Sequence, residues 1–334
     1  MLRILLTQSI HPVAQTGLAE LGEVVVAPDT SANTLRTLAE GCQVVVVRAP
    51  LPEDIFVAAP SLIGAVRHGA GVDMIPIPAA TAGGVLVANV PGVNANAVAE
   101  HVLHSMLGMA RRSRQLWERL HGRNAASWAA ARALADEGVE LAGRTVGVVG
   151  FGHVGQAIGR LCARGLSMRV LAHTRSAMGE EAGALATRVP LDELLQASDF
   201  VVLACPLTSD TRGLIGAAQL ARMRRGSMLV NVARGPVVEE LALIEALRSG
   251  QLAGAALDVF DTQPLPDDHP FWLMPQLLIT PHVAGITQDS MLAMGQGVTR
   301  AVAALLEGRV PPNCINPQAA AAFFQRTQAR SPEN

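Results

Sequence analysis

Thr145-Val-Gly-Val-Val-Gly-Phe-Gly-His-Val-Gly155 is the stretch that decides the fold of this chain. Its first five residues, four of them β-formers, run directly into a GxGxxG arrangement made by Gly150, Gly152 and Gly155. Apolar and small residues at helical spacing follow, which predicts a buried strand, a tight turn and a helix start. In that context the glycines allow the turn, the approach of a pyrophosphate and close packing of the helix. The helix N-terminus then offers N–H groups to the phosphates, so the stretch predicts dinucleotide binding.

The turn after the next predicted strand bears on the choice of cofactor. An acidic residue about 20 residues past the glycines is expected to bind the ribose 2′-OH of NAD. Here the turn reads His173-Thr-Arg-Ser176, and no carboxylate follows before Glu180. The Thr174 hydroxyl is a hydrogen-bond donor and the Arg175 guanidinium can bind a 2′-phosphate, which favours NADP while leaving NAD possible. The alternative is that Arg175 is simply a solvated loop residue.

Alternating strands and helices on both sides of this stretch predict two doubly wound parallel sheets. In residues 100–285 six strands are expected, at 145–149, 168–173, 200–204, 228–231, 254–258 and 277–280. Residues 1–99 predict a second sheet, with strands at 3–7, 23–27, 43–48, 64–68 and 85–88. A helix over 288–307 has no strand partner nearby, so we expect residues 286–334 to rejoin the first domain. From about residue 320 we expect the chain to fray.

The segment between the two predicted sheets is helical. Residues 96–121 predict one long amphipathic helix, and the Ala-rich residues 124–138 predict a second. Trp117 and Trp128 lie in this segment. A helical hairpin packed on its own domain is the plain interpretation. Two exposed tryptophans on such an arm, about residues 100–143, would instead suit a subunit interface.

The composition excludes several classes of protein. The 334 residues suffice for two domains, and a net charge of −2 provides no basic field for nucleic acid. No segment reaches the roughly 18 consecutive apolar residues of a membrane span. The four cysteines, Cys42, Cys162, Cys205 and Cys314, lie far apart without a CxxC pair. We therefore expect neither a metal site nor a disulfide, and we expect reduced thiols in a cytoplasmic protein.

Two polar residues just beyond buried strands predict the chemistry. Arg234 follows the strand that ends at Asn231, and His282 follows the strand that ends at Thr280. In an open α/β sheet both lie on the ligand side. A guanidinium that holds the carboxylate and carbonyl of a 2-oxo acid, with an imidazole that exchanges the carbonyl proton, is what hydride transfer to a ketone requires. His269, in the polar run Pro266-Asp-Asp-His-Pro, is expected to be solvated.

A glycine-rich turn, His68-Gly-Ala-Gly-Val-Asp73, follows a strand of the first domain. Its backbone N–H groups predict a cradle for a substrate carboxylate. The alternative is a tight turn without a ligand.

Together these segments resemble the D-isomer-specific 2-hydroxyacid dehydrogenases. The matching runs occur in the family's order between residues 40 and 310. They are Arg67-His-Gly-Ala-Gly-Val-Asp, Asn94-Ala-Asn-Ala-Val-Ala-Glu-His101, Gly150-Phe-Gly-His-Val-Gly, Pro206-Leu-Thr-Ser-Asp-Thr-Arg, Asn231-Val-Ala-Arg-Gly, Leu257-Asp-Val-Phe and Thr280-Pro-His.

The resemblance implies a Rossmann cofactor domain inserted in a flavodoxin-like substrate domain, and a homodimer built on the arm. It implies that Arg234 binds the substrate, that His282 is the acid/base, that Ala70 and Gly71 give N–H groups to the carboxylate, and that Asp258 holds the nicotinamide carboxamide. Arg48 is expected beside the substrate. The remaining cofactor contacts are expected from His153, Val154, Cys205, Pro206, Thr211, Val232 and Gly285.

One position departs from the family pattern. Gln263 stands where the family usually has the catalytic Glu before a proline. The amide can fix the tautomer of His282 but cannot stabilise imidazolium by charge. The run Gln263-Pro-Leu-Pro-Asp-Asp-His-Pro is similar to that of formate dehydrogenases, which carry a longer N-terminal region that this sequence does not show.

Three functions are therefore compared. The first is an NADP-preferring reductase of a small 2-oxo acid such as glyoxylate or hydroxypyruvate. The second is a formate dehydrogenase-like oxidase. The third is a non-catalytic dinucleotide sensor, which would have no need of both Arg234 and His282.

Overall fold

The computed structural model describes residues 2–328 and divides the chain into two compact units. Unit 1 comprises Met1–Asn94 and Ile286–Asn334, and unit 2 comprises Ala95–Gly285. Unit 2 is thus an insertion in unit 1. The boundary expected after residue 99 falls inside α5 (Ala95–Ala110), the first helix of unit 2.

Unit 1 is built on a five-stranded parallel sheet. The strand order is β2-β1-β3-β4-β5, the flavodoxin-like order. Its strands are β1 (Arg3–Leu6), β2 (Glu23–Val26), β3 (Val44–Val47), β4 (Gly64–Arg67) and β5 (Leu86–Ala88). The helices of unit 1 are α1 (Pro12–Ala19), α2 (Ala32–Ala39), α3 (Ile55–Ala58), α4 (Ile77–Ala82), α13 (Gln288–Leu306) and α14 (Ala320–Gln328), with a 3₁₀ turn at Pro317–Ala319.

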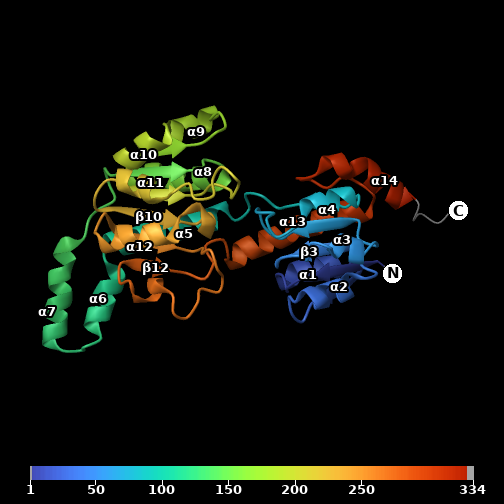
Figure 1. Cartoon of the computed structure of the whole chain (residues 1–334), viewed down its shortest axis with the longest axis horizontal. Coiled ribbons are helices and arrows are strands. Elements are labelled where there is room, and N and C mark those ends of the chain that lie inside the picture. The colour runs from blue at the N-terminus through green and yellow to red at the C-terminus, as the bar shows by residue number, and fades with distance from the viewer. Residues whose placement is uncertain (1, 329–334) are drawn as a thin grey trace. The chain divides into compact units, whose positions relative to one another are not determined.

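The central strand β3 shows why this sheet is covered on both faces. All four of its residues are valines and all are buried. Alternate side chains of a strand point to opposite faces, so Val44 and Val46 pack with α1, α13 and α14, whereas Val45 and Val47 pack with α2, α3 and α4. A continuous apolar run of this kind is typical of a parallel strand between two helical layers (Figure 1).

The C-terminal segment is docked on unit 1, so the expectation that it frays from residue 320 is wrong as far as residue 328. Phe323 is fully buried among the residues of β1, β3 and α13. Arg326 donates to the carbonyl oxygens of Gly83 and Pro60 at 2.6 and 2.5 Å. The Ala/Gln-rich composition hid this contact because one aromatic residue provides the anchor. Residues 329–334 lie outside the described part of the chain.

Unit 2 is built on a seven-stranded parallel sheet with the order β12-β11-β10-β9-β6-β7-β8. Its strands are β6 (Thr145–Val149), β7 (Arg169–His173), β8 (Thr187–Arg188), β9 (Phe200–Leu203), β10 (Ser227–Asn231), β11 (Leu252–Leu257) and β12 (Leu277–Ile279). The helices that follow the arm are α8 (His153–Arg160), α9 (Glu180–Leu185), α10 (Leu191–Ala197), α11 (Ala217–Arg222) and α12 (Glu240–Arg248), with a π-helical turn at Leu161–Gly165 and 3₁₀ turns at Gly235–Val237 and Pro270–Leu273.

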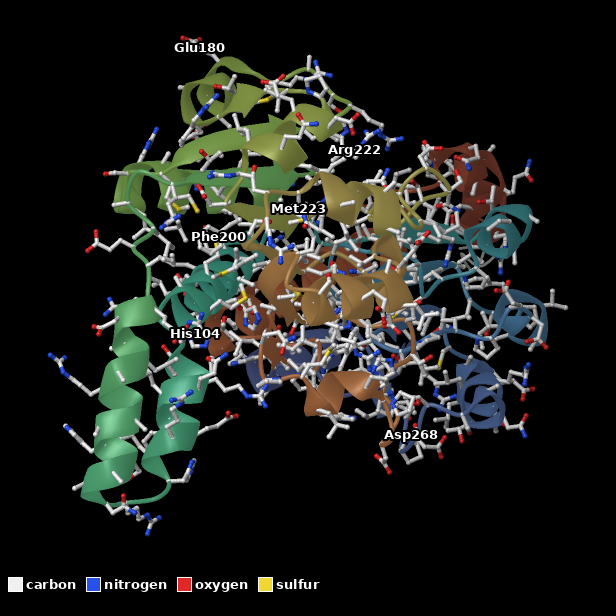
Figure 2. All side chains as sticks on the ribbon, turned by 60° about the vertical axis from the view of Figure 1, so that its left-hand side comes forward. His104, Glu180, Phe200, Arg222, Met223 and Asp268 are labelled. Carbon is white, nitrogen blue, oxygen red and sulfur yellow. The ribbon has the colours of Figure 1, made fainter. Side chains whose placement is uncertain are left out.

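The predicted α/β class with two doubly wound sheets is confirmed, and one strand was missed. The edge strand β8 has only two residues, both exposed, and is too short to show a periodic pattern. Inside the sheet, Phe200 of β9 is buried, whereas Glu180 at the start of α9 is exposed (Figure 2).

The single long helix expected over residues 96–121 is two helices. α5 ends at Ala110, and α6 (Ser113–Leu120) begins after Arg112, which has a left-handed backbone with φ of 51°. The guanidinium of Arg112 pairs with Glu137 at 2.8 Å. α5 is buried along one face, but every residue of α6 keeps some exposure, so the break turns the chain away from the core of unit 2. Neither glycine nor proline marks the break, and the apolar spacing therefore could not reveal it.

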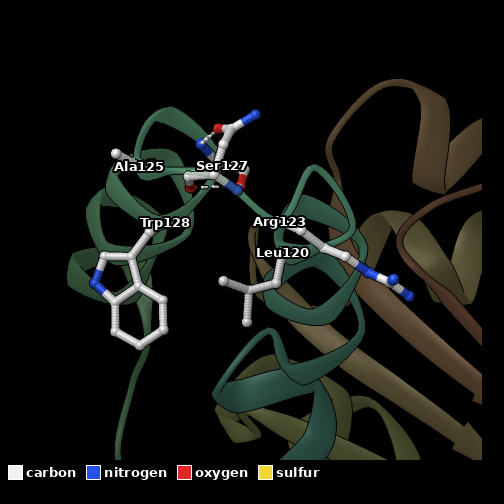
Figure 3. A pocket seen from close by; sticks show the side chains of 6 residues that line it. Leu120, Arg123, Ala125, Ser127 and Trp128 are labelled. Atoms are coloured by element: carbon white, nitrogen blue, oxygen red, sulfur yellow. Dashed lines mark hydrogen bonds between the residues drawn. The ribbon is translucent and has the colours of Figure 1, made fainter.

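α6 and α7 (Ala125–Leu134) form an antiparallel arm of unit 2, drawn in green in Figure 1. A 3₁₀ turn at Ala135–Glu137 ends it. Its two tryptophans are largely exposed, Trp117 by 66% and Trp128 by 69%. Near the tip, Leu120 and Trp128 border a hollow of about 490 Å³ between the two helices (Figure 3). The arm thus presents apolar side chains to solvent.

Candidate active site

The parallel pairing of unit 2 brings the predicted site residues of that unit to one edge of its sheet. Parallel strands end on the same side, and each of the segments below begins where a strand of unit 2 ends. The residues predicted in unit 1 follow β3 and β4, at the corresponding edge of the other sheet.

The turn after β6 has the geometry of a phosphate-binding turn. Gly150 has φ of 93°, and a Cβ there would lie 2.6 Å from the backbone nitrogen of Cys205, so only glycine fits. A Cβ at Gly152 would meet nothing within 4 Å, which leaves open space for a ligand. Gly152 is also the N-cap of α8 and has no side chain to bind the first N–H groups, at His153 and Val154. The turn therefore fits the pyrophosphate of a dinucleotide, with the buried Gly155 in the helix behind it.

Two arginines lie at the turn after β7: Arg175 within it, which the sequence predicted, and Arg188 of β8, which binds it. Arg175 pairs with Asp210 at 3.3 Å, and both side chains are about 70% exposed. Arg188 of β8 donates to the carbonyl oxygens of Thr174 and Arg175, both at 3.1 Å, and so fixes this turn. A 2′-phosphate here would compete with Asp210 for Arg175. Arg188 was missed because β8 was missed.

The loop after β9 is held by one hydroxyl. Thr211 donates to the carbonyl oxygen of Pro206 at 2.7 Å and accepts from the N–H of Thr208 at 2.8 Å. Burial raises the pKa of the Cys205 thiol. The Thr211 hydroxyl is thus engaged within its own turn, and the cofactor contacts of Cys205, Pro206 and Thr211 stay predictions.

The turn after β10 presents Arg234. Asn231, almost fully buried, accepts from the N–H of Ala233 at 3.0 Å and donates to the carbonyl oxygen of Arg234 at 3.0 Å. Val232 lies between them and donates its N–H to Leu203 of β9 at 3.2 Å. The Arg234 guanidinium donates to the carbonyl oxygen of Ala233 at 2.7 Å. A buried amide at the end of a strand is the signal that could have identified Asn231.

The turn after β12 carries His282 in a left-handed conformation with φ of 58°. The buried carboxylate of Asp258 accepts the N–H groups of Val283 and Ala284, both at 2.9 Å. It also accepts the hydroxyl of Thr280 at 2.6 Å. A non-glycine residue keeps this conformation only where its surroundings fix it. Here Asp258 accepts hydrogen bonds from residues on both sides of His282. Gly285 closes the segment at the end of unit 2.

Behind Asp258 lies a histidine that sequence reasoning did not assign. His101 of α5 has its Nε2 3.3 Å from the Thr280 oxygen. Because the Thr280 hydroxyl donates to Asp258, its oxygen accepts, and Nε2 of His101 carries the hydrogen. Burial lowers the pKa of His101, while the Asp258 carboxylate opposes this and His104 adds to it. His101 is therefore a neutral donor that supports the Asp258 network.

Gln263 lies beside His282, as predicted. Its Oε1 is 3.0 Å from Nδ1 of His282, while its Nε2 donates to the carbonyl oxygen of Phe260 at 3.2 Å. The second bond fixes the orientation of the amide, so the oxygen faces the ring and Nδ1 carries a hydrogen. Nε2 of the imidazole is then the atom available for proton exchange. The catalytic roles of Gln263, His282 and Arg234 stay predictions.

In unit 1, side chains bind the carbonyl groups of the turn after β4. Arg67 donates to the carbonyl oxygens of His68 and Gly71 at 2.8 and 3.0 Å, and Asn89 donates to that of Ala70 at 2.6 Å. Within residues 2–328, no protein acceptor takes the N–H of Ala70 or of Gly71. The turn thus fits the predicted cradle for a carboxylate.

Arg48 and His68 occupy neighbouring positions at the ends of β3 and β4. Burial lowers the pKa of Arg48, whose guanidinium donates to the carbonyl oxygen of Ser9. Burial, and then the charge of Arg48, lower the pKa of His68 to about 4. Among residues 2–328, Nε2 of His68 has no hydrogen-bond partner. Arg48 thus supplies a positive charge near this turn.

The comparisons with known proteins decide the family. Residues 103–284 match the model for the NAD-binding domain of D-isomer specific 2-hydroxyacid dehydrogenases. A glyoxylate reductase of Korarchaeum cryptofilum is 36% identical over 274 residues, which span 80% of each chain. The chain belongs to the D-isomer-specific 2-hydroxyacid dehydrogenase family. It is an oxidoreductase of this family with a nicotinamide cofactor domain.

Further relatives of this dehydrogenase agree in sequence and in fold. A glyoxylate reductase of Pyrococcus furiosus is 37% identical over 276 residues, covering 80% of this chain and 79% of the relative. The NADPH-dependent glyoxylate/hydroxypyruvate reductase of Sinorhizobium meliloti, solved with NADP and malonate, is 27% identical with a TM-score of 0.81. That alignment covers 95% of this chain and 98% of the other.

Two further features of the described residues concern metal binding and membranes. Between residues 2 and 328, no three His, Cys, Asp or Glu side chains gather in a way that could hold a metal ion. Every helix in the same range is too short or too polar to cross a bilayer.

The expectation that His269 is solvated is wrong. Its side chain is 17% exposed, and its Nε2 lies 3.4 Å from a carboxylate oxygen of Glu240. The expectation rested on the polar neighbours Asp267 and Asp268, which are indeed exposed. The residue that holds His269 lies 29 positions earlier on α12, where no local pattern could indicate it.

Arg175 and Asp210 yield a prediction about the cofactor. Arg175→Ala should raise the Michaelis constant for NADPH roughly tenfold or more, since a paired phosphate contact contributes about 1.5–3 kcal/mol. The Michaelis constant for NADH should stay nearly unchanged. Asp210→Asn should lower the Michaelis constant for NADPH, because a carboxylate that competes for Arg175 is removed. Steady-state kinetics with both cofactors measure this, and equal use of NADPH and NADH by the parent enzyme would contradict it.

Gln263 yields a prediction about pH. His282 must be protonated to donate a proton to a carbonyl, so reduction is present at low pH and lost as pH rises through the pKa of His282. A carboxylate beside the ring stabilises imidazolium, so Gln263→Glu should move this falling limb upward by roughly one unit. The pH profile of kcat/KM tests it, with Asp261→Asn as the control. If the falling limb of the pH profile does not move in Gln263→Glu, Gln263 is not the partner of His282. If the limb moves to lower pH in Asp261→Asn, Asp261 is the residue that stabilises the imidazolium.

Proposed function

We propose that this protein reduces a small 2-oxo acid of the glyoxylate or hydroxypyruvate type, with NADPH as the preferred hydride donor and NADH as the weaker one. The observation that carries the proposal is the turn in which Asp258 holds His282 in a left-handed conformation, at the edge from which Arg234 also emerges. The relatives named glyoxylate reductase and glyoxylate/hydroxypyruvate reductase support the substrate class.

In the proposed reaction each residue has a separate task. Arg234 binds the carboxylate and the carbonyl oxygen of the 2-oxo acid through its planar fork. When bound, a reduced nicotinamide would supply the hydride that C2 accepts. Nε2 of His282 gives its proton to the carbonyl oxygen, which becomes the hydroxyl of the product. Gln263 keeps the hydrogen on Nδ1 throughout, so that Nε2 is the only atom of the ring that exchanges a proton.

The binding of the cofactor and of the substrate carboxylate is part of the same proposal. The turn at Gly150 and Gly152, with the start of α8, would bind the pyrophosphate. Asp258 would hold the nicotinamide carboxamide. In unit 1, the N–H groups of Ala70 and Gly71 would bind the substrate carboxylate, and Arg48 would add positive charge. NADP is favoured over NAD because Arg175 lies in, and Arg188 binds, the turn where an acidic residue would favour NAD.

The test is a panel of 2-oxo acids assayed with NADPH and NADH, together with formate and oxidised cofactor. We expect reduction of glyoxylate or hydroxypyruvate by the parent. Arg234→Ala should lower kcat/KM roughly 100-fold or more and leave cofactor binding intact. Arg222→Ala is the matched control, since Arg222 lies on the surface of α11 and pairs with Asp192 (Figure 2).

Three results would contradict this assignment, each in a different way. Formate-dependent reduction of the cofactor without 2-oxo acid turnover would favour an oxidase. Tight cofactor binding without turnover of any acid would favour a sensor. An Arg234→Ala variant with more than a tenth of the parental efficiency would remove Arg234 from substrate binding.

We further propose that two copies of this chain associate through the arm of α6 and α7. Trp117 and Trp128 are more than 60% exposed there, and large aromatic side chains are enriched at the cores of protein interfaces. The hollow beside Trp128 offers space for a side chain of the second copy.

A cytoplasmic location is proposed as well, because all four cysteines carry free thiols, as expected in a reducing compartment.

The dimer can be tested by its mass in solution. Replacing both Trp117 and Trp128 by Ala should shift the mass measured by light scattering from two chains toward one at micromolar concentration. Leu241→Ala is the control, because Leu241 is an exposed apolar residue of α12 outside the arm. A parent with the mass of one chain, or a double variant with the parental mass, would contradict the proposal.

A further inference from the structure

Gln263 lies on an irregular loop, residues 261–269, between β11 and the 3₁₀ turn Pro270–Leu273. Much of this loop faces solvent, including Asp268, which is labelled in Figure 2. Yet Oε1 of Gln263 must stay 3.0 Å from the imidazole of His282 for the amide to set the tautomer. The position of this loop therefore has to be fixed by residues outside it.

Glu240 contacts the loop at both of its ends. One oxygen of its carboxylate accepts the N–H of Asp261 at 3.1 Å, and the other lies 3.4 Å from Nε2 of His269. The side chains of Glu240 and His269 are 21% and 17% exposed. Burial, and then the Glu240 carboxylate, raise the pKa of Asp261, while Arg212 lowers it. A single carboxylate thus bridges the first and last residues of a nine-residue loop.

His269 is anchored so that it faces Glu240. Its Nδ1 accepts the N–H of Phe271 at 3.3 Å, so Nε2 carries the hydrogen that Glu240 accepts. Its ring packs edge-on against Phe271, with the ring centroids 4.5 Å apart, and Phe271 is buried in the core of unit 2. Neutral imidazole satisfies both contacts. The far end of the loop is therefore fixed to the core through His269.

Glu240 is itself rigidly placed. It is the first residue of α12, which buries Leu243, Ile244 and Leu247. The segment that leads from Arg234 to Glu240 runs against the start of the loop, since a Cβ at Gly235 would lie 2.0 Å from the carbonyl carbon of Phe260. The segment that presents Arg234 thus also carries the residue that bridges the loop.

We propose that Glu240, together with His269, is a positioning residue of the reaction: by bridging the two ends of loop 261–269, Glu240 holds Gln263 against His282. The proposal rests on the proposed function, because it assigns Gln263 a task in that reaction. Neither Glu240 nor His269 touches the reacting atoms. They act through Gln263 alone, which separates this role from a general contribution to stability.

The kinetic test compares Glu240→Gln with Glu245→Gln, a control on the same helix whose side chain is exposed and pairs only with Arg248 in the described structure. In Glu240→Gln one oxygen still accepts from Asp261, but an amide N–H₂ now opposes the N–H of His269. We expect kcat for 2-oxo acid reduction to fall roughly tenfold, with the NADPH dissociation constant unchanged, because a small displacement of a catalytic contact is costly. Glu245→Gln should behave as the parent.

The decisive comparison repeats Glu240→Gln in a Gln263→Ala background. If Glu240 acts through Gln263, the second substitution should change kcat less than about twofold, because there is no amide left to position. Equal losses of kcat in both backgrounds would overturn the proposal, as would an unchanged kcat in Glu240→Gln alone.

A second readout requires no turnover. Hydrogen–deuterium exchange of residues 259–272 should be faster in Glu240→Gln and His269→Ala, and parental in Glu245→Gln and in His269→Gln, whose amide can still donate to Glu240. Parental exchange in the first two variants would overturn the bridge. If the parent turned over no 2-oxo acid, the proposed function would be wrong. The exchange rates of residues 259–272 would then still test whether Glu240 bridges the two ends of the loop.

Discussion

All seven strands of the sheet in unit 2 pair in parallel, and the site depends on this constraint. Parallel pairing brings the ends of β6, β10, β11 and β12 to one edge, where four short turns carry the predicted site residues. The strands themselves are apolar and buried between helices, so they tolerate little variation. The turns begin where this packing ends. A glycine turn, a guanidinium, a carboxylate and an imidazole therefore come to one edge although they are up to 132 positions apart, from Gly150 to His282.

Asp258 is the residue on which the geometry of the imidazole depends. A left-handed backbone at a non-glycine residue costs on the order of 1–2 kcal/mol, and His282 has that backbone. The three hydrogen bonds that Asp258 accepts from the same turn each contribute about 1 kcal/mol net, so they offset the cost. His101 supports Asp258 from behind through Thr280. Loop 261–269, bridged by Glu240, then brings Gln263 to the other side of the ring.

The sequence predicted those features whose cause is local. Gly150 marks a turn whose positive φ and close backbone contact only glycine accommodates, and the position of Arg234 and His282 just beyond apolar strands implies the ligand side of a sheet. The break at Arg112 was not predictable, since no glycine or proline marks it. The contacts of Arg175 with Asp210 and of His269 with Glu240 join residues 35 and 29 positions apart, and such pairs follow from the tertiary fold. Solvation of His269 was a reasonable expectation from its polar neighbours, and the distant carboxylate of Glu240 overturned it.

The central claim is that a nicotinamide held at this edge passes a hydride to C2 of a 2-oxo acid while His282 protonates the oxygen. Mass spectrometry of the glycolate formed from glyoxylate and NADPH that carries deuterium at both C4 positions tests this claim most directly. The account predicts one deuterium on C2 of every glycolate formed, because the hydride comes from C4 and the proton on oxygen exchanges with water. Glycolate without deuterium on C2, or no glycolate at all, would contradict it.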